Sequence, residues 1–208
     1  MTKLLVVGAA FLQGFLSMGF QLVATRTVAP FYGSTLMVWA FIISTFLVAF
    51  SLGALFGGSR SRLPAVDVLR SVIFIGIVGV TGFFVTACFN HEIIGFIDQS
   101  IQNLLLGLGI TCVVLFFLPI TSLSSILPIF TEALIKSGGR GGLSTGIVYG
   151  ISTLGNVVGV MSTAFVLIPH LHTSTILEGW SAASLLCFYV FFLVVKKSMH
   201  VEGSKASI

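Results

Sequence analysis

Residues 101–135 read IQNLLLGLGITCVVLFFLPITSLSSILPIFTEALI, and Glu132 is the one charged side chain in this stretch. An apolar run of this kind is typical of a membrane-spanning helix, which needs about 20 residues to cross the hydrocarbon core. The stretch is long for one crossing and short for two, and it contains Pro119 and Pro128. Its number of crossings therefore decides the topology of the whole chain.

The rest of the chain has the same apolar character. Of its 208 residues, 56% are hydrophobic and only 8% are charged. A soluble domain carries about 25% charged residues. This chain can stay dispersed only if most of its surface faces lipid, where backbone polar groups must be paired inside helices or a closed barrel. The apolar runs are about 20 residues long rather than alternating segments of about 10, which predicts helices.

Five further apolar runs predict membrane helices. They are residues 4–23, 36–57, 71–89, 143–168 and 175–195. The first run could be taken for a signal peptide, but it is longer than the apolar stretch of about 7–15 residues that a signal peptide uses. We therefore interpret it as a retained first helix.

The distribution of Lys and Arg distinguishes one crossing from two in residues 101–135. With one crossing the chain has six helices, and nine of its ten Lys and Arg residues lie on the side of the N-terminus, with Arg26 opposite. Two crossings would move the basic residues after residue 135 to the other side and erase this bias. Because cytoplasmic loops are enriched in Lys and Arg, we predict a single crossing by one long helix, kinked at proline.

The predicted architecture is an all-α membrane protein, a six-transmembrane-helix bundle that forms one polytopic domain over residues 1–208. We expect it in the cell (inner) membrane, in contact with the lipid bilayer and with both termini cytoplasmic. The head of three residues and the tail of about a dozen are too short for an appended soluble domain. The net charge of +4 does not indicate a nucleic-acid partner, because the basic residues are scattered at helix ends.

Two stripes of polar residues interrupt the apolar helices at spacings of three and four, which places each stripe on one helix face. The residues are Gln13, Ser17 and Gln21 in the first helix and Tyr149, Ser152, Thr153 and Asn156 in the fifth. Both stripes should point inward, because an unpaired polar group in hydrocarbon costs several kcal/mol. They predict either a polar cavity between the two helices or hydrogen bonds that only hold the bundle together.

Glycine pairs separated by four residues recur in two of the predicted helices. They are Gly53/Gly57 in the second helix, and Gly146/Gly150 and Gly155/Gly159 in the fifth. In lipid such small residues let helix backbones approach closely, so we interpret these pairs as packing positions.

No motif indicates an enzyme, a metal site or a cofactor. The sequence contains no HExxH, GxSxG or GxxxxGK[ST] pattern and no pair of carboxylates within an apolar run. Cys88, Cys112 and Cys187 are widely spaced and form no CxxC, which argues against a disulfide framework or a zinc site. We therefore expect no catalytic residues, no metal and no cofactor.

Two segments resemble a known family. The first comprises residues 26–34 (RTVAPFYGS), Val38 with Trp39, and residues 52–58 (LGALFGG); the second comprises Gly146, Tyr149, residues 152–155 (STLG), Gly159, Phe165 and residues 167–169 (LIP). Together they resemble the membrane domain of the fused major facilitator/spermidine synthase-like family. The motif residues that carry the resemblance most clearly are Arg26, Pro30, Gly33, Trp39 and Pro169.

The resemblance implies a bundle similar to one half of a major facilitator transporter. In fused members an aminopropyltransferase-like domain follows, and this sequence contains no such domain. Many relatives carry an acidic residue where Gln21 stands, an Asn where Ser152 stands and a Gly where His172 stands. The missing acid argues against a polyamine as cargo, because a multiply charged cation needs a buried carboxylate.

The sequence thus predicts a transporter-like membrane subunit that acts as a homo-oligomer or with a separate membrane or soluble partner subunit. A polyamine or a related small solute is a candidate substrate. The alternative is a non-transporting membrane scaffold or anchor that holds partner proteins through its glycine-rich faces.

The six-helix topology predicts which positions are accessible from outside the cell. In a background without native cysteines, an external thiol reagent should label Cys at Glu92 or His172 and should miss Cys at Ser61 or Gly138. External labelling at Gly138 would show that residues 101–135 cross twice, which contradicts six helices.

Overall fold

The computed structural model describes residues 2–136 and 138–205, and within these residues the elements are all helical. They are α1 (Thr2–Tyr32), α2 (Leu36–Ser61), α3 (Ala65–Ser100), α4 (Leu104–Cys112), η1 (Val113–Phe117), α5 (Leu118–Lys136), α6 (Gly141–Ser162), η2 (Thr163–Leu167), α7 (Ile168–His170) and α8 (Thr173–Lys205). The segments η1 and η2 are π-helical turns. In the described chain six helices are long and apolar enough to cross a membrane, which confirms the all-α six-helix bundle of a multi-pass membrane protein.

Most helices extend beyond their predicted bounds. The first continues to Tyr32 rather than to residue 23, and the third covers Ala65–Ser100 rather than residues 71–89. Apolar composition marks the part of a helix that faces hydrocarbon, whereas backbone hydrogen bonding continues into the interface beyond it. The bounds of an apolar run are therefore shorter than the helix that contains it.

The decisive stretch forms one helical span, Leu104–Lys136, as predicted from the charge distribution. Its π-helical segment η1 ends two residues before Pro119, and π-bulges are a recognised cause of helix bending. Pro119 has no N–H to donate to the Leu115 carbonyl, and Thr86 Oγ1 of α3 donates to that carbonyl instead, at 2.7 Å. Gly82 makes room for the proline ring, because a Cβ there would lie 2.9 Å from Pro119 Cδ.

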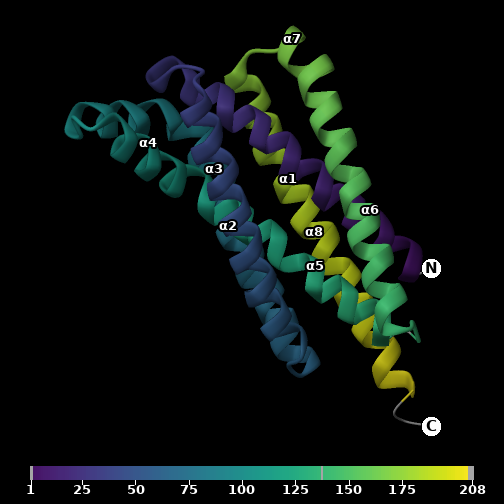
Figure 1. Cartoon of the computed structure of the whole chain (residues 1–208). Coiled ribbons are helices and arrows are strands. Elements are labelled where there is room, and N and C mark those ends of the chain that lie inside the picture. The colour runs from purple at the N-terminus through teal and green to yellow at the C-terminus, as the bar shows by residue number, and fades with distance from the viewer. Residues whose placement is uncertain (1, 137, 206–208) are drawn as a thin grey trace.

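The helix α1 lies at the centre of the bundle. It packs closely against α6 and α8 and also contacts α2 and α5, while α2 packs mainly on α5 and α3 packs on α5 and α8. Figure 1 shows α2 and α6 on opposite sides of the bundle, with α1, α5 and α8 between them. The outward faces of α2 and α6 are therefore the least covered surfaces in the described chain.

Four phenylalanines from four helical elements form the centre of the core. Phe20 of α1 is fully buried, and its ring centroid lies 4.7 Å from that of Phe83, 5.8 Å from that of Phe116 and 6.1 Å from that of Phe46. Edge-to-face and tilted contacts of this kind stabilise aromatic clusters beyond the area they bury. The cluster joins α1, α2, α3 and η1 at one point.

Glycines bring α6 into backbone contact with α1. A Cβ at Gly155 would overlap the Phe11 carbonyl, and one at Gly159 would overlap the Phe15 carbonyl. The prediction of close packing is wrong for Gly146 and Gly150, since a Cβ at either position would meet no atom within 4 Å. Only the second glycine pair of this helix faces α1.

The other predicted glycine pair, Gly53 and Gly57 in α2, lies in close contact with α5. A Cβ at Gly53 would overlap the Ser124 hydroxyl, and one at Gly57 would overlap the Ser125 carbonyl. Both partners belong to α5. The two helix pairs α1–α6 and α2–α5 are therefore each held together through glycine faces.

The start of α1, the end of α8 and the turns α2–α3 and α5–α6 all lie toward the lower right of Figure 1. At this end Ser61 is buried, and Gly138 has a φ of +92°, a conformation that disfavours Cys. Arg140 is exposed in the same α5–α6 turn, so it is the better position for testing the topology by labelling.

The glycine contacts generate a stability prediction. Gly155→Leu or Gly159→Leu should lower the free energy of unfolding by at least about 1–3 kcal/mol, because the new side chain would overlap the α1 backbone. Thermal unfolding in detergent measures the loss. Gly150→Leu is the matched control on the same helix, because open space surrounds that position. Equal stability of Gly155→Leu and Gly150→Leu would contradict backbone contact between α1 and α6.

Candidate functional site

Three residues of the two polar stripes form a buried hydrogen-bond network between α1 and α6. Ser152 Oγ donates to Gln13 Oε1 at 2.8 Å, and Gln13 Nε2 donates to Ser17 Oγ at 3.1 Å. Ser17 Oγ in turn donates to the Gln13 carbonyl at 2.8 Å. All three residues are buried. This part of the stripes matches the prediction of hydrogen bonds that hold the bundle together.

The remaining α6 residues of the stripe line an open cavity of about 190 Å³. The cavity lies between α2 and α6, and α1 and α5 also contribute to its wall. Its lining residues are Gln13, Met18, Phe50, Ala54, Ser124, Leu127, Tyr149, Ser152, Thr153 and Asn156. Five of the seven candidate residues, Gln13, Tyr149, Ser152, Thr153 and Asn156, thus line one cavity, to which four helices contribute.

Tyr149 and Asn156 offer polar groups to this cavity. Within residues 2–136 and 138–205, neither the Tyr149 hydroxyl nor the Asn156 side-chain amide hydrogen-bonds to another protein group. Tyr149 is 41% exposed, which leaves its ring accessible from outside the bundle. Thr153 Oγ1 differs, because it donates to the Tyr149 carbonyl at 2.8 Å within its own helix. Two hydrogen-bonding side chains thus face the cavity without a protein partner in the described chain.

Gln21 does not belong to the cavity, contrary to the prediction. It lies two helical turns from Gln13 and is half-buried, and its backbone carbonyl accepts from Thr25 Oγ1 at 3.1 Å. Ser17 also lies outside the cavity lining, since its hydroxyl is enclosed in the network with Gln13. Regular spacing places residues on one face, but helices that cross at an angle stay in contact over only part of that face.

The polar stripes did not predict the side of the cavity formed by α2 and α5. Phe50 and Ala54 come from α2, and Ser124 and Leu127 come from α5. Ser124 Oγ donates to the Ala49 carbonyl of α2 at 3.2 Å, which fixes its position beside the cavity. The signal that could have found this wall is the run of hydroxyl residues TSLSS at positions 121–125, in an otherwise apolar stretch.

The five family-motif residues lie at the opposite end of the bundle from the α2–α3 turn. Arg26 Nη1 donates to the Ile168 carbonyl at 3.2 Å, so the first motif segment contacts the residue before Pro169. Gly33 has a φ of +77° in the turn between α1 and α2, a conformation that favours glycine. Pro30 is exposed in the last turn of α1, and Trp39 is partly exposed on α2. None of the five lines the cavity.

The wall of the cavity carries hydroxyl, amide and apolar groups, and none of its lining residues is charged. Such a surface binds through hydrogen bonds and apolar contact. It lacks the carboxylate that would balance a cation in a site of low dielectric constant.

Comparison with family models, curated proteins and solved structures finds no match to this chain.

The buried network generates a prediction that separates structural from cavity residues. Gln13→Leu should lower the free energy of unfolding by about 1–2 kcal/mol, because the buried Ser152 hydroxyl loses its acceptor on α1. Gln13→Leu combined with Ser152→Ala should cost less than the sum of the two single changes. Thr153→Val is the control, since its hydroxyl bonds only within α6. Additive losses in the double variant would show that Gln13 and Ser152 do not interact.

Proposed function

We propose that this protein is a subunit of a membrane transporter for a small polar solute, with the cavity between α2 and α6 as its binding site. The main support comes from Tyr149 and Asn156. Their polar groups line the cavity and have no protein hydrogen-bond partner in the described chain. In hydrocarbon such groups are costly unless water or a ligand satisfies them. Polar groups that only hold a bundle together would be paired as Gln13 and Ser152 are.

The proposal includes a second subunit that closes the cavity. Side chains of α1, α2, α5 and α6 line it, and one side is open. Six helices with both ends on one side allow a parallel pair, as in transporters whose halves are related by an axis along the membrane normal. The resemblance to half of a major facilitator transporter supports the same arrangement. A second copy is the simplest partner, and a different membrane subunit is the other candidate.

The solute class follows from the cavity wall. A cavity volume of about 190 Å³ supports a small solute. The uncharged wall supports a neutral or weakly polar solute that accepts and donates hydrogen bonds. It does not support a polyamine, which would require a carboxylate at this depth.

The orientation we propose places the α2–α3 and α5–α6 turns in the cytoplasm. The described basic side chains at this end are Lys3, Arg60, Arg62, Arg70, Lys136, Arg140, Lys196 and Lys197. Arg26 lies near the other end of α1. This asymmetry supports cytoplasmic termini in an inner membrane.

A membrane scaffold is the alternative function. The outward faces of α2 and α6 expose many apolar side chains, among them Leu47, Leu55, Leu154 and Val157. Lipid or a partner helix covers such faces equally well, so they do not by themselves favour a scaffold. Transport through the cavity requires the polar groups of Tyr149 and Asn156, whereas a scaffold role does not.

Transport by reconstituted vesicles tests the proposal. Vesicles that contain the native protein should take up or release at least one neutral solute from a broad panel. The double change Tyr149→Phe and Asn156→Leu should reduce that rate by at least about tenfold, because it removes both unpaired polar groups. The variant should stay folded, since neither group bonds to the rest of the protein.

Two controls sharpen this experiment. Val157→Leu alters an exposed apolar residue of the same helix outside the cavity, and Gln21→Leu alters the polar residue that the cavity excludes. Both should transport at the native rate. Vesicles that move no solute, or a double variant that transports normally, would remove the cavity as the functional site and leave the scaffold.

A further inference from the structure

A second cavity, of about 630 Å³, opens at the end of the bundle where α2 meets α3. Its wall combines an apolar set and a polar set of side chains. The apolar set is Phe56, Leu63 and Phe74, and the polar set is Arg60, Arg70, Asp67 and Ser71. This cavity is separate from the one between α2 and α6, with which it shares no lining residue.

The two phenylalanines lie further from the helix ends than the two arginines. Phe56 precedes Arg60 by four residues on α2, and Phe74 follows Arg70 by four residues on α3. Because an α-helix rises 1.5 Å per residue, each phenylalanine lies about 6 Å deeper in the span than its arginine. On α3 the cavity therefore has Arg70 near its mouth and Phe74 one turn further into the span, whereas on α2 the Arg60 guanidinium reaches back over the Phe56 ring.

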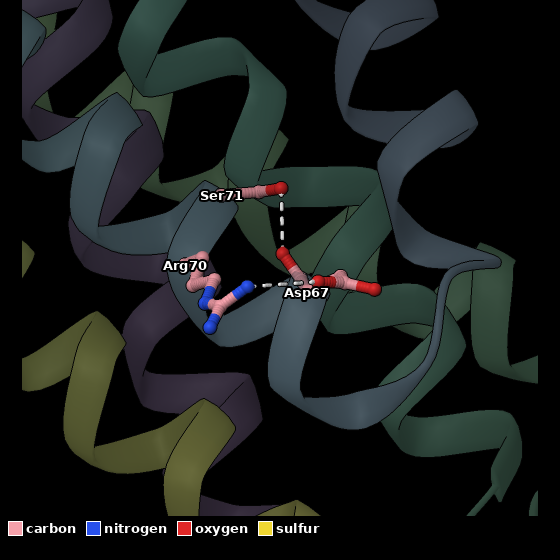
Figure 2. Close-up of polar contacts among 3 residues, drawn as sticks. All are labelled: Asp67, Arg70 and Ser71. Carbon is pink, nitrogen blue, oxygen red and sulfur yellow. Dashed lines mark hydrogen bonds and ion pairs between the residues drawn. The ribbon is translucent and has the colours of Figure 1, made fainter.

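Most hydrogen-bond donors of the two arginines are available to a ligand. Figure 2 shows Arg70 beside Asp67, and Arg70 Nη1 lies 3.7 Å from Asp67 Oδ1; the Arg70 side chain is largely exposed and that of Asp67 is half-exposed. Such a solvent-screened pair is weak. Arg60 lies over the Phe56 ring at 5.1 Å, and within the described residues its guanidinium makes no hydrogen bond or ion pair. Each guanidinium has five N–H donors.

The local charge favours an anion. Arg60, Arg62 and Arg70 surround the turn, and Asp67 is the one acidic side chain among residues 56–74, so the net charge is +2 (three minus one). Guanidinium groups match the geometry of phosphate oxygens and bind them with paired, charge-assisted hydrogen bonds. Basic pockets between membrane helices bind anionic lipid headgroups in this way.

We propose that the α2–α3 cavity is a binding site for an anionic phospholipid. Its phosphate lies between Arg60 and Arg70 at the helix ends, and the start of an acyl chain packs on the exposed ring of Phe74. The aromatic wall decides in favour of a lipid over a free phosphate, since only a lipid fills both parts of the cavity. The site does not depend on what the cavity between α2 and α6 carries.

Native mass spectrometry of the purified full chain, titrated with phosphatidylglycerol, tests the site. The double change Arg60→Gln and Arg70→Gln should weaken lipid binding by about tenfold or more. Phe74→Ala should also weaken it, because Phe74 is 61% exposed and contributes the apolar wall. These side chains lie at the surface, so the variants should keep native helix content by circular dichroism.

The matched control is Arg140→Gln with Lys196→Gln, which removes two exposed charges at the same end of the bundle outside the cavity. This control should bind lipid as the native protein does. Equal losses in the two double variants, or native affinity in Arg60→Gln/Arg70→Gln, would overturn the site.

Two further ligands identify the source of the phosphate. Phosphatidylcholine should bind more weakly than phosphatidylglycerol, and a large excess of inorganic phosphate should fail to displace the anionic lipid. Displacement by inorganic phosphate would show a site for free phosphate. Equal affinity for phosphatidylcholine would show that the arginines do not select an anionic headgroup.

Discussion

The hydrocarbon core offers no hydrogen-bond partner, so each polar backbone group of this protein must be satisfied within the bundle. Helices meet this demand along most of the chain. Where Pro119 removes a donor, Thr86 of the neighbouring helix supplies one to the Leu115 carbonyl at 2.7 Å. Trp180 Nε1 likewise donates to the Leu16 carbonyl at 3.1 Å, which ties α8 to α1. The same constraint that forces helices thus also selects the side chains that join them.

Packing between the helices explains why the polar stripe of α6 has two roles. Apolar side chains gain nothing by leaving lipid, so helices associate through close van der Waals contact and hydrogen bonds. Gly155 and Gly159 allow the α6 backbone to approach α1 closely, and Ser152 hydrogen-bonds to Gln13 on the same contact face. Tyr149 lines the cavity instead, and so does Asn156, although the Asn156 backbone lies against Gly14 of α1. The position of the glycines therefore decides which polar residues hold the bundle and which remain available.

The two cavities use different physical chemistry because they lie at different depths. The cavity between α2 and α6 has an uncharged wall, which suits hydrogen bonding at a depth where a charge is expensive. The cavity at the α2–α3 turn has arginines at the helix ends, where a charge costs less than within an apolar span. Each proposal accordingly rests on separate residues and on a separate measurement.

The sequence alone predicted the all-α bundle, its six helices long and apolar enough to cross a membrane, and one helical span over most of residues 101–135, because apolar length is set by the bilayer rather than by tertiary contacts. It also placed Ser152, Tyr149 and Asn156 on one stripe. Only the tertiary structure decided that this stripe divides between a network and a cavity, and that Gln21 belongs to neither. Helix periodicity places residues on a face, but the crossing of the helices and their close glycine contacts determine how much of that face is buried.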